Sequence, residues 1–333
     1  MTTALLLLLS ITVVLAGALL FTNGVEWLGA KLDLGQGAVG SLLAAVATAL
    51  PETLIPVTAI VSGGAGSHEI ATGAILGAPF LLATLAMALL GGAAYGWRRR
   101  RPQGSALDVH VQTLERDLGF FVGCFAVAFG LGVLGVPPWL RLTAAVALVL
   151  AYTAYVRLTL ARSGEVAVES ELKPLLFDTT KDDPPGAATV IVQLVVALGA
   201  IVGGAHMFVE QLVHASERLG VEPLVLSLVI APFATELPEK INSIFWARSG
   251  KDTLALGNIT GALVFQSTLP VAFGLAFTDW HLQTSAIVAG ALALAGGLLA
   301  VFELRVRRRF EAAGIAVWLM LWLAFVVYVV VVA

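Results

Sequence analysis

Charged residues are scarce in this chain: Asp, Glu, Lys and Arg make up 12% of its 333 residues. Soluble domains carry about 25% charged residues, so this composition excludes an ordinary water-soluble fold. The single cysteine, Cys124, excludes a disulfide framework. The net charge of −3 offers no basic face for phosphate groups, so we expect no nucleic-acid partner.

Apolar residues dominate instead, at 59% of the chain with a mean hydropathy of +0.93. A helix needs about 20 predominantly apolar residues to cross a bilayer, and ten runs bounded by charge, Gly or Pro come close to that length. The sequence therefore predicts an all-α membrane protein with ten transmembrane helices. The expected spans are 3–22, 37–61, 70–95, 118–135, 139–161, 187–213, 221–246, 253–277, 282–302 and 312–332.

Lysine and arginine are distributed unevenly between the loops that join these spans. Sixteen of the 19 basic residues lie in loops on one side, against Arg141 and Arg218 on the other, and Lys240 lies within a span. Because loops rich in Lys and Arg stay in the cytoplasm, we expect a multi-pass protein of the cell membrane with both termini extracellular. The charged segment 162–186 is then a cytoplasmic linker.

The chain contains an internal repeat. Leu32–Glu52 aligns with Leu219–Glu239 without a gap, and both segments end in Ala-Thr-x-Leu-Pro-Glu. The spans that follow also match, with Gly77 aligned to Gly261 once the second connecting loop is taken as slightly shorter than the first. A shared composition of Ala, Leu and Val does not account for a doubled Thr-x-Leu-Pro-Glu in mid-span.

Each repeat belongs to a half of five spans, so the second half crosses the membrane in the opposite sense. We expect a first half at 1–161 with its repeat at about 24–93, and a second half at 187–333 with its repeat at about 205–277. Inverted repeats with interrupted helices at corresponding positions are typical of secondary transporters, whose binding site lies near the membrane midplane.

Three acids fall near the centres of their spans: Glu52, Glu236 and Glu239. A charged side chain at that depth costs about 2.5–3.5 kcal/mol on insertion scales, so such residues are typical of functional sites. Pro51 and Pro238 each leave a backbone carbonyl without its helical partner. Both features indicate a bound cation.

The oxygens of each repeat can converge on one point. Thr48 and Glu52 are four residues apart, as are Thr235 and Glu239, and residues at this spacing share one face of a helix. Two helices crossing here would surround a site with two carboxylates, threonine oxygens and backbone carbonyls. Hard oxygen ligands with a net charge of −2 favour Ca²⁺ over a transition metal.

Lys240 lies four residues after Glu236 on the same helix face, which makes it a candidate charge partner. Two interpretations of Glu236 therefore stay open: an ion-binding acid, or one half of a structural ion pair. His206 and His214 lie on one span, and their role is left open. The sequence contains no His-Glu-x-x-His motif and no nucleotide fingerprint, so we do not expect an enzyme.

With these motifs the chain resembles the Ca²⁺/cation antiporter superfamily, and most of all its sodium/calcium exchanger branch. The resemblance rests on the doubled Thr-x-Leu-Pro-Glu and the ten-span plan. It implies exchange of Ca²⁺ for Na⁺ by alternating access, without a cofactor, by a monomer in contact with membrane lipid. It also implies that Ca²⁺ is held by Thr48, Glu52, Thr235 and Glu239, and that backbone oxygens of Ala45 and Pro232 bind sodium.

The chain departs from the family at residues that flank this site. Where the family has a serine after each threonine, this chain has Ala49 and Glu236, and the serines of the following span are Ala78 and Ala262. The polar position four residues further on is Gln266 in the second repeat. Glu236 and Gln266 therefore join the candidate cation ligands. Exchange of a divalent cation for protons is the alternative to sodium coupling, and a cation channel is a less favoured one.

Overall fold

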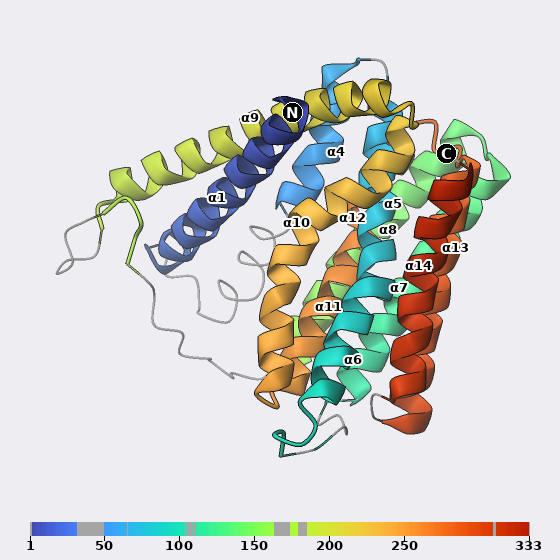
Figure 1. The fold of residues 1–333 in the computed structure, drawn as a ribbon. Helices are drawn as coiled ribbons and strands as arrows, with labels where there is room; N and C mark the ends of the chain where they lie inside the picture. Colours follow the sequence, from blue (N-terminus) through green and yellow to red (C-terminus); the bar gives the residue numbers. More distant parts are fainter. Residues whose placement is uncertain are drawn as a thin grey trace.

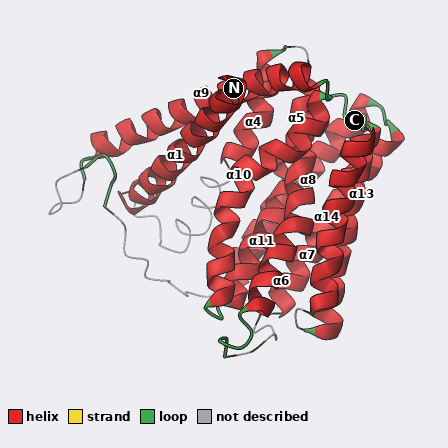
Figure 2. Ribbon diagram, viewed as in Figure 1, coloured by secondary structure: helices red, strands yellow, loops and turns green. Residues whose placement is uncertain are grey.

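The computed structural model describes residues 2–31, 50–64, 66–102, 104, 109, 111–162, 174–178, 185–308 and 311–332. Within these ranges all regular structure is helical, as expected (Figure 2). Two π-helical turns, η2 (Leu82–Ala86) and η3 (Glu303–Arg307), continue the helices that precede them. The helices are α1 (Thr2–Lys31), α4 (Leu50–Ser62), α5 (Ser67–Leu81), α6 (Met87–Gly96), α7 (Val111–Leu134), α8 (Pro138–Arg162), α9 (Ala187–Leu219), α10 (Pro223–Arg248), α11 (Asp252–Gln266), α12 (Leu269–Phe277), α13 (Thr284–Phe302) and α14 (Ala312–Val332).

Eight helical stretches are long and apolar enough to cross a membrane. A helical, multi-pass membrane fold is therefore confirmed, whereas the number ten stays a prediction. The expected spans at 37–61 and 221–246 are not among the eight, because α4 is described only from residue 50 and α10 is apolar only over Pro223–Glu236. The eight are Thr3–Lys31, Ser67–Gly96, Val111–Leu134, Pro138–Thr159, Ala187–Leu219, Asp252–Phe277, Thr284–Arg307 and Ala313–Val331.

Several helices extend beyond the apolar runs that predicted them. α1 continues to Lys31 rather than ending at 22, and α7 begins at Val111 rather than at 118. The added turns contain polar residues, among them Asn23 and Asp117, that are buried against other parts of the protein. Hydropathy alone places a span boundary at such residues, because it does not register a polar side chain that has partners inside the fold.

Helices α1 and α9 contact each other along their length, and the end of α1 and the start of α9 lean away from the other helices (Figure 1). The end of α9 instead contacts α4. Gln193 is fully buried between α1 and α9 and donates hydrogen bonds to Leu20 O (2.8 Å) and Asn23 Oδ1 (3.0 Å). The amide of Leu176 donates to Asn23 Oδ1 (3.0 Å), and the amide of Phe177 donates to Gln193 Oε1 (2.9 Å). A short part of the expected linker is therefore anchored on this helix pair.

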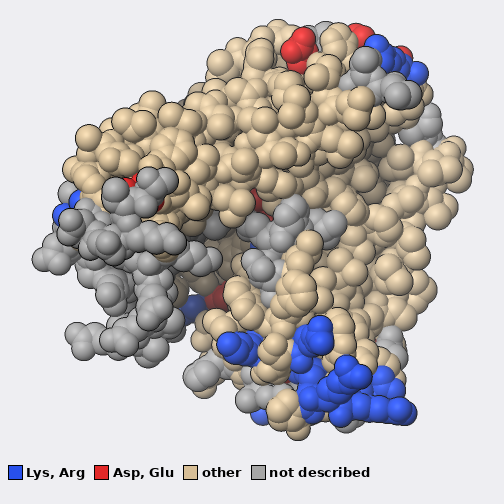
Figure 3. All heavy atoms as spheres, turned by 60° about the vertical axis from the view of Figure 1, so that its left-hand side comes forward, with Lys and Arg blue, Asp and Glu red and all other residues tan. Residues whose placement is uncertain are grey.

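The other helices surround α5 and α6, most of whose residues are buried. α1 begins and α14 ends at the same end of the molecule, whereas α6 and α10 end at the opposite one (Figure 1). Most of the Lys and Arg side chains visible in Figure 3 gather at that opposite end. We call it the basic end; its residues include Arg98–Arg101, Arg248, Lys251 and Arg305.

Two helices are interrupted at matching points of the repeat. The run from α5 to α6 passes through η2, and a two-residue turn separates α11 from α12. At each point a threonine hydroxyl donates to the carbonyl four residues earlier, Thr84 to Phe80 (2.5 Å) and Thr268 to Val264 (2.8 Å). Thr84 aligns with Thr268, and Phe80 with Val264, in the same alignment that places Gly77 on Gly261.

The motif proline of the second repeat does not interrupt its helix. α10 runs unbroken through Pro232 and Pro238, so the interruptions lie in the helices that follow the motifs. A proline removes one helical hydrogen bond, and membrane helices tolerate that loss where neighbouring helices and Ser or Thr side chains compensate for it. Between the two prolines, the hydroxyl of Thr235 donates to Ala231 O at 3.2 Å on the same helix.

Candidate cation site

The described residues of the expected site lie on three helices. Glu52 is in the first turn of α4 and is 7% exposed. Thr235 and Glu236 lie on α10, Gln266 is the last residue of α11, and all three are buried. The described polar residues of the expected site are thus inside the protein rather than on its surface.

Some expected site residues lie outside the described part of the chain. Ala45 and Thr48 fall within the undescribed segment 32–49. Glu239 belongs to the described backbone of α10, but its side chain is outside the description. Pro232, expected to offer its carbonyl oxygen, is buried on α10.

Glu236 joins α10 to α11. Its Oε1 accepts a hydrogen bond from Nε2 of Gln266 at 2.9 Å. Its Oε2 lies 3.5 Å from Nζ of Lys240, which is the contact that the spacing of four residues allowed. The side chains of Lys240 and Glu236 are 3% and 2% exposed, so the carboxylate meets an amide and an ammonium group inside the protein.

Polar contacts continue from Lys240 along the same two helices. Nζ of Lys240 lies 3.5 Å from the carbonyl oxygen of Asn258 on α11, and Nδ2 of Asn258 donates to Oγ of Ser243 on α10 at 2.9 Å. Buried polar networks whose members are paired make a structure rigid. This network fixes α11 against the part of α10 that carries the Leu-Pro-Glu motif.

On its other side α10 packs closely against α5. A Cβ atom at Gly73 would lie 2.7 Å from Leu224 O, and one at Gly77 would lie 2.7 Å from Cγ of Pro232. Because glycine has no side chain, Gly73 and Gly77 let the backbones of α5 and α10 approach each other closely. A buried apolar cluster that includes residues of α4, α5, α9 and α10 also holds α4 near this face of α10.

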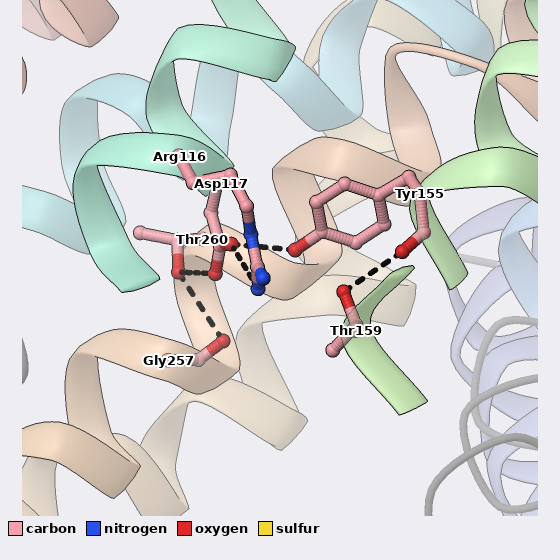
Figure 4. Close-up of polar contacts among 6 residues, drawn as sticks. All are labelled: Arg116, Asp117, Tyr155, Thr159, Gly257 and Thr260. Carbon is pink, nitrogen blue, oxygen red and sulfur yellow. Dashed lines mark hydrogen bonds and ion pairs between the residues drawn. The ribbon is translucent and has the colours of Figure 1, made fainter. Parts of the chain in front are cut away.

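A further buried acid, Asp117 of α7, was not predicted from the sequence. Its carboxylate accepts hydrogen bonds from Tyr155 OH (2.5 Å), Thr260 Oγ1 (3.1 Å) and Nη2 of Arg116 (3.3 Å), as Figure 4 shows. Tyr155 belongs to α8 and Thr260 to α11, so one carboxylate ties three helices together. The sequence offered one signal, because Asp117 directly precedes the apolar run 118–135. Hydropathy, however, assigned this acid to a loop.

A second buried ion pair lies near the basic end. Nη2 of Arg101 contacts both carboxylate oxygens of Asp252 at 2.5 and 2.6 Å, and the two side chains are 0% and 1% exposed. From the sequence, Arg101 is expected only to be one of the loop residues that set orientation. The structure instead uses it to join the segment after α6 to the start of α11.

The two histidines of α9 have separate partners. Nδ1 of His206 lies 3.2 Å from Oγ of Ser62 at the end of α4, and Nδ1 of His214 lies 3.7 Å from Glu217. Among the described side chains, no group of three or more His, Cys, Asp and Glu residues is placed to hold a metal ion. The ligand atoms that the described residues of the expected site offer are instead carboxylate, amide and hydroxyl oxygens, which suit hard cations.

The family comparison covers nearly all of the chain. The model of the family described as sodium/calcium exchanger protein matches residues 2–161 and 189–331. The chain belongs to this family. Membership of a family described as sodium/calcium exchanger protein agrees with the resemblance that the repeated motifs indicated.

Two curated relatives match parts of this exchanger-family chain. Sodium/calcium exchanger MaX1 of Methanosarcina acetivorans is 38% identical over 77 residues, which are 23% of this chain and 22% of that protein. CaxA, a proposed antiporter of Alkalimonas amylolytica, is 26% identical over 136 residues, which are 40% of this chain and 43% of that protein. The chain therefore spans less than half the length of each of these relatives.

Three solved structures share the fold over almost the full length of this chain. The H⁺/Ca²⁺ exchanger CAX superposes with a TM-score of 0.73 at 22% identity, covering 99% of this chain and 86% of that one. YfkE gives 0.67 at 14% identity, with 98% of both chains covered. The sodium-calcium exchanger NCX_Mj gives 0.59 at 19% identity, also with 98% of both chains covered. At these identities the likeness concerns the fold.

Proposed function

We propose that this chain is a secondary active antiporter that exchanges Ca²⁺, or a similar divalent cation, for Na⁺ by alternating access. The observation that carries the proposal is the buried contact of Glu236 on α10 with Gln266 at the end of α11. It places a carboxylate and an amide at the interruption between α11 and α12, in the helices that form the second repeat. Membership of a cation exchanger family supports the same conclusion.

The proposed Ca²⁺ ligands are Thr48, Glu52, Thr235 and Glu239. Glu236 and Gln266 would complete the cation site, with backbone oxygens of Ala45 and Pro232 as further ligands. Burial of the described members supports this assignment, because an acid is retained at membrane depth where it has a partner or a function. No resident cofactor is needed, since the ions themselves are the cargo.

The proposed architecture has ten crossings in two inverted halves, 1–161 and 187–333, joined by 162–186. Three observations support it: the family model matches the halves as two stretches, the helical interruptions fall at aligned positions of the two repeats, and α1 begins where α14 ends. We also propose that the protein functions as a monomer, with membrane lipid around it and both termini outside the cell.

The orientation can be tested by labelling a single introduced cysteine. Leu176 suits this test, because it is 58% exposed and lies in the expected cytoplasmic linker, whereas its neighbour Leu175 is buried. In a Cys124→Ser background, Leu176→Cys should react with an impermeant maleimide only after the cells are opened. Labelling in intact cells would show that the orientation is reversed.

A flux assay tests the coupling ion. Purified protein in vesicles is given an outward Na⁺ gradient at fixed pH, then a pH gradient without Na⁺, then neither, and Ca²⁺ uptake is measured. Uptake driven by Na⁺ supports the proposal. Uptake driven only by the pH gradient would favour the proton-coupled alternative. The observation that supports this alternative is that Ala78 and Ala262 stand where the family has serines. Uptake without any counter-ion gradient would identify a channel.

A further inference from the structure

Two differences between the repeats place opposite charges one helical turn apart. In the ungapped alignment of the two motifs, Ala49 falls on Glu236, and Thr53, one position beyond the first motif, falls on Lys240. The second repeat therefore has one carboxylate and one ammonium group more than the first. The two replacements together add no net charge.

The structure brings these two charges into contact. Nζ of Lys240 lies 3.5 Å from Oε2 of Glu236, and both side chains are almost completely buried. Gln266 donates to the other carboxylate oxygen at 2.9 Å, and the carbonyl oxygen of Asn258 lies 3.5 Å from Nζ. Removing one partner of a buried ion pair leaves an uncompensated charge, which is strongly destabilising. Glu236 and Lys240 therefore each stabilise the charged form of the other.

Lys240 offsets the charge that Glu236 adds, so the transported ions have the same charge to balance as in a site with two acids. Glu52, Glu236 and Glu239 contribute three negative charges, and Lys240 contributes one positive charge, which leaves a net charge of −2. One Ca²⁺ cancels this charge, and so do two monovalent cations. Because excess charge at membrane depth is costly, the loaded forms that rearrange most readily are the neutral ones.

We propose that Lys240 is a tethered cation that replaces a third coupling ion and so fixes the exchange at two monovalent cations for each Ca²⁺. The ammonium group keeps its charge and stays in the protein throughout the cycle, so the exchange moves no net charge across the membrane. This inference rests on the proposed exchange function, and it holds for either coupling ion. Without Lys240 the charge would be −3, three monovalent cations would be needed, and each Ca²⁺ would be accompanied by one net charge.

The voltage dependence of the Ca²⁺ gradient tests this role. Wild-type protein, Lys240→Met and the double variant Lys240→Met/Glu236→Gln are reconstituted in vesicles whose potential is set with K⁺ and valinomycin. The equilibrium distribution of radioactive Ca²⁺ is then measured at a fixed gradient of the coupling cation. We expect no voltage dependence in the wild type, and in Lys240→Met a change of about tenfold in the Ca²⁺ ratio for each ~60 mV.

The double variant is the matched control, because it removes both charges and returns the count to −2. Its Ca²⁺ ratio should again be independent of voltage, whatever its rate. A voltage-dependent wild type, or a transporting Lys240→Met protein with an unchanged ratio, would overturn the role of Lys240.

If Lys240→Met does not fold, the double variant decides. Exchange without voltage dependence supports the charge count, and voltage-dependent exchange contradicts it. Absence of Ca²⁺ exchange by the wild type under either gradient would refute the proposed function and this inference together. Ca²⁺ exchange with the wrong voltage dependence would refute the role of Lys240 alone.

Discussion

An alanine at position 77 would press directly on the helix that carries Glu236. A Cβ atom there would lie 2.7 Å from Cγ of Pro232 and closer still to the carbonyl oxygen of Leu228. Real Cβ atoms essentially never come within 3.0 Å of another heavy atom. Because the oxygen of Leu228 is backbone, no rotation of a side chain relieves the contact, and α5 and α10 have to move apart.

The expected cost is that of overpacking a close helix contact, about 1–3 kcal/mol. Replacing glycine by alanine inside a helix also brings a gain of about 0.8–1.0 kcal/mol from helix propensity. Gly92→Ala measures that gain alone, since Gly92 lies on α6, in the same transmembrane stretch, and a Cβ there meets no described heavy atom within 4 Å. The difference between the two variants therefore isolates the contact between α5 and α10.

Both variants would be compared by thermal unfolding in detergent and by Ca²⁺ flux in vesicles. We expect Gly77→Ala to unfold at a lower temperature than the wild type and to transport Ca²⁺ more slowly, because the displaced α10 carries Thr235 and Glu236. Gly92→Ala should match or exceed the wild type in stability and keep its flux. Equal behaviour of the two variants would refute the close approach of α5 and α10.

Three further substitutions, two of them paired with a comparison variant, test separate features of the site and of the contacts that support it. Glu52→Gln should abolish Ca²⁺ transport without lowering the unfolding temperature, because it removes charge and keeps volume; undiminished uptake would remove Glu52 from the site. Asp117→Asn should lose about 1–3 kcal/mol of stability, since it leaves donors on three helices poorly paired, and Thr260→Val should lose less; the reverse order would contradict the network in Figure 4. Arg101→Ala should cost about 3–5 kcal/mol by leaving Asp252 buried without its cation, whereas an apolar replacement of both residues should recover most of that loss; equal losses would show that the charge itself is not what matters.

Local spacing was enough to predict some of these contacts. Glu236 and Lys240 are four residues apart on one helix, and helix geometry alone brings such side chains together. Asp117 could not be found this way, because its partners Tyr155 and Thr260 lie 38 and 143 residues away in the sequence. Its burial depends on how α7, α8 and α11 pack, and hydropathy carries no information about that packing.

The helical interruptions give a second example of this limit. The motif prolines were the obvious candidates for breaking a helix, yet α10 continues through Pro238. The interruptions fall instead near Thr84 and Thr268, whose hydroxyls bond to carbonyls one turn earlier. Both threonines occupy the same repeat position, so the sequence held a signal for the location. The signal was weak, since threonine makes this bond in many uninterrupted helices.

The two sides of α10 are held in different ways, and the difference explains how one symmetric repeat can form an asymmetric site. Toward α5, backbones approach closely at Gly73 and Gly77, and this contact contributes shape but no charge. Toward α11, Lys240 and Gln266 bind Glu236 through polar contacts. Gly77 aligns with a glycine in the other repeat, whereas Glu236 and Lys240 align with uncharged residues. The aligned glycine, Gly261, lacks this close contact, since a Cβ atom there meets no described heavy atom within 4 Å. Within the described residues, the close glycine contact with α10 therefore belongs to the first half, and the charged pair belongs to the second.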